Sequence, residues 1–150
     1  MPRFRRYQSA VPNRRGTYPG VFALANGLAE HGLLDADDHA WLRAANRRAY
    51  DLHADPSAAD PHCYDRDLNP GARAWFKDPA GELLEFVSGY LALLDRYAVP
   101  WVELTTTSPG RVVYEDAVQV VAVPYAYPGD WVLHEPVRPD RSAPDRRPAT

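Results

Sequence analysis

The stretch from residue 78 to residue 123 decides the fold: DPAGELLEFVSGYLALLDRYAVPWVELTTTSPGRVVYEDAVQVVAV. In its first half, apolar residues recur with the spacing of one helix face, and Asp78-Pro79 precedes them as a cap. After Pro100 the period changes from 3.6 to two, and β-branched residues become frequent. A helix followed by strands is therefore expected, which is the pattern of an α+β fold.

Two further helices, joined by a short turn, are expected upstream of this stretch. Gly32 can close the first helix in the left-handed conformation, and Asp35 can cap the second. The segment 55–71 contains three prolines and no periodicity, which indicates a long loop. The expected elements are a weak edge strand over 4–11, helices over 19–31, 36–54 and 79–98, and strands over 72–76, 101–107 and 112–123.

The fold class that follows is α+β, a helical hairpin and a third long helix packed on a small, mainly antiparallel sheet centred on a C-terminal β-hairpin. A chain of 150 residues is expected to form one domain, here residues 1–135, with 1–16 as a basic arm or edge strand. Residues 136–150 are rich in proline and arginine, which predicts a disordered tail.

Composition narrows the function classes. The chain has one cysteine, so it cannot form an internal disulfide, and it has no apolar run long enough for a membrane span. We expect a cytoplasmic protein without a membrane partner. The net charge is −3, and the acids are concentrated after the first 15 residues, which argues against a domain that coats nucleic acid.

One candidate site follows from strand register. If Ser108 to Arg111 form a type II turn, Glu103 faces Asp116 across the ladder, next to Glu115. A bulge or solvent exposure can relieve the repulsion of these carboxylates. Alternatively, one of them has a raised pKa suited to acid–base chemistry, or both bind a divalent cation. The candidate catalytic residues are Glu103, Glu115 and Asp116.

A second candidate site is the basic start of the chain, where the first 15 residues contain five arginines and no acid. Arginine binds phosphate and aromatic rings stack on bases, so one interpretation is an anion-binding arm. The alternative, which is the more common outcome for such a segment, is a solvated, mobile arm without a ligand. Trp75 lies close in sequence to Lys77, the only lysine. Its ring can form a shelf on which a ligand stacks, and the alternative is that Trp75 is an aromatic residue of the core. The candidate ligand-binding residues are Arg5, Arg6, Arg14, Arg15, Tyr18, Trp75 and Lys77.

The long loop does not match a known metal site. Asp65, Asp67 and Asn69 have the 1,3,5 spacing of a calcium loop, but position 6 is Pro70 and position 12 is Phe76. Loop stabilisation by Asx-turns is therefore expected. No metal ligand and no cofactor are predicted.

Two functions remain open. The first is a binding or regulatory module for an anionic ligand, either a phosphate-bearing small molecule or a nucleic acid, or for an acidic protein partner. The alternative is a small hydrolase or group-transfer enzyme that acts on a phosphate-bearing substrate through the strand carboxylates. Aromatic residues in the last third of the chain also favour a homodimer formed through the sheet edge.

Overall fold

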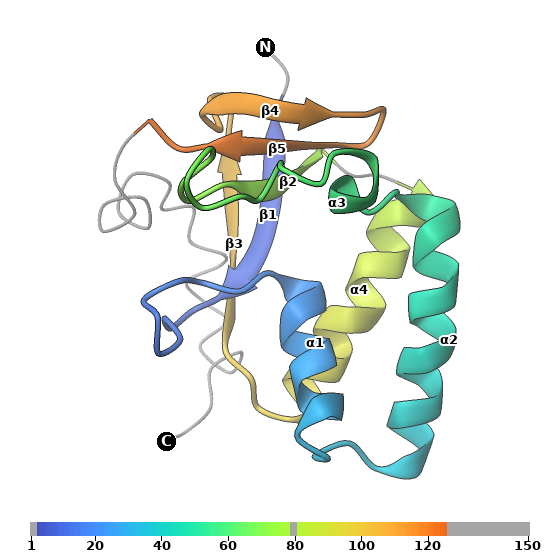
Figure 1. The fold of residues 1–150 in the computed structure, drawn as a ribbon. Coiled ribbons are helices and arrows are strands. Elements are labelled where there is room, and N and C mark those ends of the chain that lie inside the picture. Colours follow the sequence, from blue (N-terminus) through green and yellow to red (C-terminus); the bar gives the residue numbers. More distant parts are fainter. Residues whose placement is uncertain (1–2, 79–80, 126–150) are drawn as a thin grey trace. The chain divides into compact units, whose positions relative to one another are not determined.

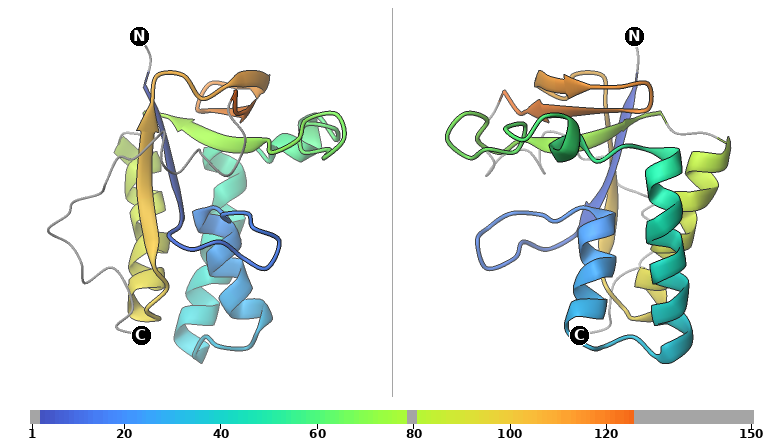
Figure 2. Two further views of the ribbon diagram at one scale, coloured as in Figure 1. Left: turned by 90° about the vertical axis from the view of Figure 1, so that its left-hand side faces the viewer. Right: turned by 45° about the vertical axis from the view of Figure 1, so that its right-hand side comes forward.

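The computed structural model describes residues 3–78 and 81–125. It combines helices with an antiparallel sheet, which confirms the α+β fold (Figure 1 and Figure 2). The expected tail over 136–150 lies outside the described residues. In chain order the elements are β1 (Phe4–Ser9), α1 (Val21–Glu30), α2 (Ala36–Leu52), α3 (Pro56–Ala59), β2 (Arg73–Lys77), α4 (Gly81–Arg96), β3 (Trp101–Thr106), β4 (Arg111–Glu115) and β5 (Gln119–Val123).

Within the described residues the chain divides into two compact units. The strand unit consists of residues 3–6, 50–78 and 104–125, and the helical unit consists of residues 7–49 and 81–103. Strands β1 and β3 contribute residues to both units. In these ranges, no helix has the length and apolar composition that crossing a bilayer requires.

The strand order is β3-β1-β2-β5-β4, so β1 lies inside the sheet and β3 and β4 form its edges. The expectation that residues 4–11 form an edge strand is therefore wrong. The predicted hairpin between 101–107 and 112–123 is also wrong, because β4 pairs with β5 instead of β3. The segment 112–123 reads as one strand because its apolar residues continue on both sides of a turn at Asp116, which splits it into β4 and β5.

The strands of the strand unit pair antiparallel around β2. Trp75 of β2 pairs with Val120 of β5, and Arg5 of β1 pairs with Phe76 of β2. A register shift interrupts the β4–β5 ladder between Val112 and Tyr114. A bulge was expected near Glu115 and Asp116, two residues further along the chain.

Gly110 is required where the chain enters β4. Its φ is +127°, and a β-carbon at this position would lie 2.1 Å from the carbonyl oxygen of Val123. No side chain fits this approach of two backbone segments. The expected turn at 108–111 is thus the connection from one edge strand to the other, and it does not close a hairpin.

The expected caps are present at the start of α2 and at the end of α1, whereas the expected cap Asp78-Pro79 before α4 lies partly outside the described residues. Asp35 caps α2, since its Oδ1 accepts a hydrogen bond from the Asp38 amide at 2.8 Å. Gly32 has a φ of +67° and ends α1 as expected, and the Leu33 amide donates back to the Leu28 carbonyl. At the start of α1, Gly20 occupies the N-cap without a side-chain hydrogen bond, so a cap at Thr17 is wrong.

The long loop is held together by its own aspartates. Asp55 accepts from the Ser57 amide, Asp60 from the His62 amide, and Asp65 from the amides of Asp67 and Leu68. These are Asx-turns, as expected, and the first of them begins the short helix α3.

Each unit has its own apolar interior. Buried side chains of the helical unit include Val21, Ala25, Leu28, Leu42, Val87, Tyr90, Leu93 and Leu94, and those of the strand unit include Cys63, Trp75, Phe76, Val120, Val121 and Ala122.

Candidate functional site

The predicted strand carboxylates are not brought together. Glu103 lies in β3 and Asp116 follows β4, and these strands form opposite edges of the sheet. The register that would place the two carboxylates across one ladder is therefore wrong. No three side chains of His, Cys, Asp or Glu within 3–78 and 81–125 are grouped as a metal site. A catalytic role for these acids stays a prediction without a shared site.

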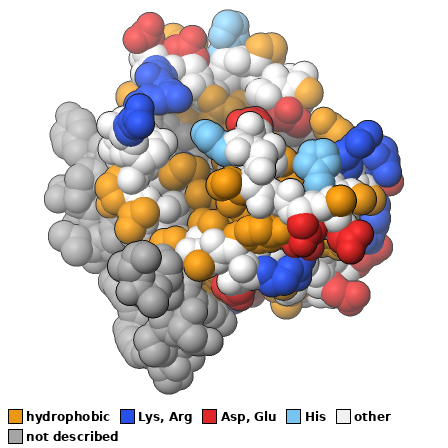
Figure 3. Space-filling model, turned by 90° about the horizontal axis from the view of Figure 1, so that it is seen from below, with side chains coloured by type: hydrophobic (Ala, Val, Ile, Leu, Met, Phe, Trp, Pro, Cys, Tyr) orange, Lys and Arg blue, Asp and Glu red, His pale blue; other side chains and the backbone are white. Residues whose placement is uncertain are grey.

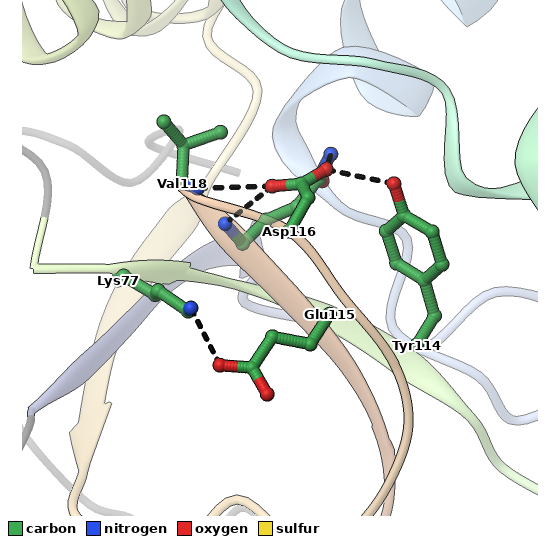
Figure 4. A network of polar contacts seen from close by, with 6 residues as sticks. Lys77, Tyr114, Glu115, Asp116 and Val118 are labelled. Atoms are coloured by element: carbon green, nitrogen blue, oxygen red, sulfur yellow. Dashed lines mark hydrogen bonds and ion pairs between the residues drawn. The ribbon is translucent and has the colours of Figure 1, made fainter.

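Glu115, a predicted catalytic residue, instead forms an ion pair with Lys77, a predicted ligand-binding residue. The Lys77 Nζ lies 2.5 Å from the Glu115 Oε2 (Figure 4). Lys77 ends β2 and Glu115 ends β4, and both strands pair with β5. Both side chains are partly exposed, so this pair contributes at most about 1 kcal/mol to stability.

Asp116 organises the turn between β4 and β5. Its carboxylate accepts hydrogen bonds from the amides of Val118 and Gln119 and from the Tyr114 hydroxyl, at 2.8–3.0 Å (Figure 4). The Gln119 Nε2 also donates to it at 3.0 Å. Partial burial opposes ionisation, but these hydrogen bonds outweigh it and lower the pKa of Asp116. The group is therefore an ionised structural acceptor, which does not suit a general acid.

The first two predicted ligand-binding arginines belong to the sheet. Arg5 lies 3.1 Å from the Asp78 carboxylate, and the Arg6 guanidinium donates to the Ala74 carbonyl at 2.9 Å. Burial lowers the pKa of Arg6 to about 10, against the opposing effect of the neighbouring Tyr64. Both side chains are held by the strand unit, and they do not form a mobile arm.

Arg14 and Arg15 lie in an exposed loop of the helical unit, and the half-buried Tyr18 follows them. Asn13 fixes this loop, since its Oδ1 accepts from the amides of Arg15 and Thr17. The amides of Arg15 and Thr17 are thus satisfied within the loop, and the side chains of Arg14 and Arg15 are exposed. The predicted ligand residues are distributed over two units.

Trp75 lies in the core of the strand unit. Its side chain is only 1% exposed, and the Arg73 guanidinium lies over its ring at 5.0 Å. Trp75 is therefore a core aromatic residue, which is the alternative interpretation, and neither face of its ring is open for a ligand to stack on.

A groove in the helical unit is the best candidate site. It has a volume of about 700 Å³, within the range of ligand pockets, and lies between α2 and α4. Both walls carry small residues, Ala44 and Ala45 on α2 and Gly81 and Gly89 on α4. The remaining lining residues are Trp41, Arg48, Glu82, Glu85 and Phe86.

The apolar part of the groove rests on an aromatic cluster. Tyr90 makes edge-to-face contacts with Trp41, Phe86 and Phe22, with ring centroids 5.3, 5.1 and 4.8 Å apart. Trp41 is 38% exposed, whereas Phe86 and Tyr90 of the same cluster are buried. Its indole thus forms one end of the groove with a ring that solvent reaches. Such a partly exposed ring on a rigid support suits an apolar ligand group.

A partly buried chain of hydrogen bonds links the two walls of the groove. The Tyr90 hydroxyl donates to the Asn46 Oδ1 at 2.6 Å, and the Asn46 Nδ2 donates to the Asn26 Oδ1 at 2.8 Å. Burial raises the pKa of Tyr90 to about 12, so the hydroxyl stays protonated and remains a donor. This chain links α4, α2 and α1.

Charged residues lie at the end of the groove opposite Trp41. The Arg48 guanidinium lies 5.5 Å from the Phe86 ring centroid and 3.4 Å from the Glu82 carboxylate. Glu85, one turn further along α4, is exposed and makes no ion pair or hydrogen bond with another described residue. The groove thus combines an aromatic end with a polar end that has a spare carboxylate.

Sequence reasoning missed this groove. Trp41 stands at the edge of the apolar stripe of α2, which was the one available signal, but nothing in the sequence pairs α2 with α4. On the face shown in Figure 3, hydrophobic side chains of the described residues gather near the middle, and acidic and basic side chains lie mainly around them. A search for relatives gives no further guidance: no family model, no curated protein and no solved structure matches this chain.

Proposed function

We propose that this chain is a binding module whose α2–α4 groove holds an apolar side chain of a protein partner. The observation that carries the proposal is the groove itself, where small residues on both walls leave about 700 Å³ beside a partly exposed indole. Aromatic anchors in such pockets dominate many protein interfaces. The described lining residues include no Ser, Cys, His or Lys, which supports binding over nucleophilic catalysis.

Filling the groove tests this proposal. Ala44 is exposed on α2, so Ala44→Phe adds a ring to the groove without changing the core. Ala23 is an exposed helical alanine of α1 outside the groove, so Ala23→Phe is the matched control. The probe is a stapled helical peptide with an apolar face of Leu and Phe and with Gln on both flanks. Its affinity is measured by fluorescence anisotropy, and its site is mapped by amide chemical shifts.

We expect Ala44→Phe to weaken peptide binding at least tenfold, while Ala23→Phe binds within about twofold of the wild-type protein. The shifted amides should lie on the facing turns of α2 and α4. Equal binding by the two variants would refute the groove as the site.

A second candidate function, binding of an anionic ligand, is supported by Arg14 and Arg15. Both side chains are exposed on a loop fixed by Asn13, and neither forms an ion pair with another described residue. Calorimetric titration with inorganic triphosphate tests this function. The double variant Arg14→Gln/Arg15→Gln should lose binding, whereas Arg43→Gln/Arg47→Gln, on the exposed face of α2, should retain it. Equal loss of triphosphate binding in both double variants would mean that binding depends only on the net charge of the protein.

A further inference from the structure

The chemistry of the groove rim indicates what the partner carries. Three charged side chains line it, Arg48, Glu82 and Glu85. Arg48 is engaged twice, over the Phe86 ring and with Glu82, whereas Glu85 has no charged partner among the described residues. Glu82 and Glu85 are three residues apart on α4, and like charges at this spacing repel each other. The rim therefore has one carboxylate that is open to a cation.

The length and direction of the groove indicate the shape of the partner. Arg48 pairs with Glu82 at one end and Trp41 contacts Gly89 at the other, so α2 and α4 run antiparallel along the groove. At about 1.5 Å per residue, the distance from Trp41 to Arg48 along α2 is roughly 10 Å, or two helical turns. This length accommodates anchors at positions i and i+4 of a docked helix.

A helix suits this surface better than an extended peptide does. Both walls belong to helices, whose backbone amides and carbonyls are used within the helix. An extended segment would find no backbone partners here, whereas a helix satisfies its own backbone groups and needs only side-chain contacts.

Helices α1 and α4 of a second copy of this chain do not provide a cation for the rim. Helix α1, VFALANGLAE, contains no basic residue. The basic residue in the last turn of α4, Arg96, is paired with Asp38. Helix α2 has exposed arginines at positions 43 and 47, but its exposed aromatic residues do not supply the anchor. Trp41 is part of the groove itself, and Tyr50 belongs to the strand unit.

Resting on the proposed function, we infer that the partner segment is a basic amphipathic helix. Its apolar anchor occupies the space between Trp41 and Phe86, and a Lys or Arg on the flank that faces α4 pairs with Glu85. The apolar contact provides most of the affinity, and the ion pair selects the partner and its orientation.

Three stapled peptides with the same apolar face test the inference. Their flanks carry Lys, Gln or Glu, and dissociation constants are measured by anisotropy at low and at high salt. We expect the Lys peptide to bind about tenfold more tightly than the Glu peptide at low salt, with the Gln peptide between them and the difference reduced at high salt. Glu85→Gln should weaken the Lys peptide three- to fivefold and leave the Gln peptide unchanged. Glu30→Gln, an exposed acid of α1 outside the groove, is the matched control.

The outcomes separate the two proposals. If the Gln peptide binds at the groove but the three affinities are equal, or the Glu peptide binds best, the groove function stands and the basic partner is overturned. If Glu30→Gln has the same effect as Glu85→Gln, the role of Glu85 is overturned. If no peptide shifts the groove amides, both proposals fall. Self-association of the chain through the groove, seen by analytical ultracentrifugation and lost in Ala44→Phe, would replace the basic helix by a second copy.

Discussion

The indole of Trp41 lies directly against the backbone of Gly89. A β-carbon at Gly89 would come within 2.7 Å of the indole Cζ2 and 3.2 Å of Cη2. Gly89 is an interior residue of α4 and has no positive φ, so the contact, and not the backbone conformation, requires the glycine here. This contact brings α2 and α4 together at the aromatic end of the groove.

Gly89→Ala should therefore lower stability although alanine is the better helix former. The added methyl group must displace Trp41, which costs about 1–3 kcal/mol. Gly27, in α1, is the matched control, because a β-carbon there meets nothing within 4 Å. Gly27→Ala should raise the free energy of unfolding by up to about 1 kcal/mol. Urea denaturation measures both variants, and equal stabilisation by the two would contradict the Trp41–Gly89 contact.

Asn46 should be the most sensitive polar residue of the helical unit. Asn46→Ala removes the acceptor of the buried Tyr90 hydroxyl and the donor to Asn26, which should cost about 1–3 kcal/mol of unfolding free energy. Tyr90→Phe should cost less in the Asn46→Ala background than in the wild-type protein, because the hydroxyl has already lost its partner.

Arg43→Ala, an exposed substitution on the same helix, serves as the control and should change stability by less than about 0.5 kcal/mol. Additive effects of the Asn46 and Tyr90 substitutions on the free energy of unfolding would show that the Tyr90–Asn46 hydrogen bond contributes no coupling energy.

Asp116 should stabilise the strand unit in a pH-dependent way. Its pKa is lowered in the folded protein from the ordinary value of 3.8, so its contribution is present above about pH 4. The contribution is lost as the pH falls below that value towards the folded pKa. Asp116→Ala should remove the acceptor of the two turn amides and lower stability at pH 7.

Asp116→Asn keeps one amide acceptor but places an NH₂ group against the Gln119 Nε2, so it should lie between Asp116→Ala and the wild-type protein. Unfolding measured from pH 2.5 to pH 7 tests this order. A wild-type stability for both variants at pH 7 would show that the carboxylate does not hold the turn.

His53 should give a second pH dependence, at higher pH. Burial lowers its pKa below the ordinary value of 6.5, despite opposing contributions that include the nearby Asp116. Below about pH 6.5 the unfolded chain binds a proton that the folded chain does not, so stability falls as the pH decreases through this range.

His53→Gln should flatten the stability profile between pH 5 and pH 7, as measured by thermal unfolding. His39→Gln, an exposed substitution on α2, is the control and should leave the profile unchanged. Equal profiles for His53→Gln and the wild-type protein would show that His53 is not buried in its neutral form.

Local signals in the sequence were enough to place most elements. The period of 3.6 with Gly32 and Asp35 at the helix ends predicted α1 and α2, and the same period before Pro100 predicted α4. Aspartate spacing in the long loop predicted Asx-turns, which depend only on a side chain and the amides two or three residues later. Each of these features is decided within one or two turns of chain.

Strand order and the site needed the tertiary structure. The sequence contains the turn at Asp116, but only the strand pairing shows that β1 lies between β3 and β2 and that β4 pairs with β5, so that β3 and β4 lie apart. The groove depends on residues far apart in the chain, since Trp41 meets Gly89 and Arg48 meets Glu82. The helix period fixes which residues share a face, but packing of α2 against α4 decides which faces meet, because apolar burial is non-directional and does not specify its partner.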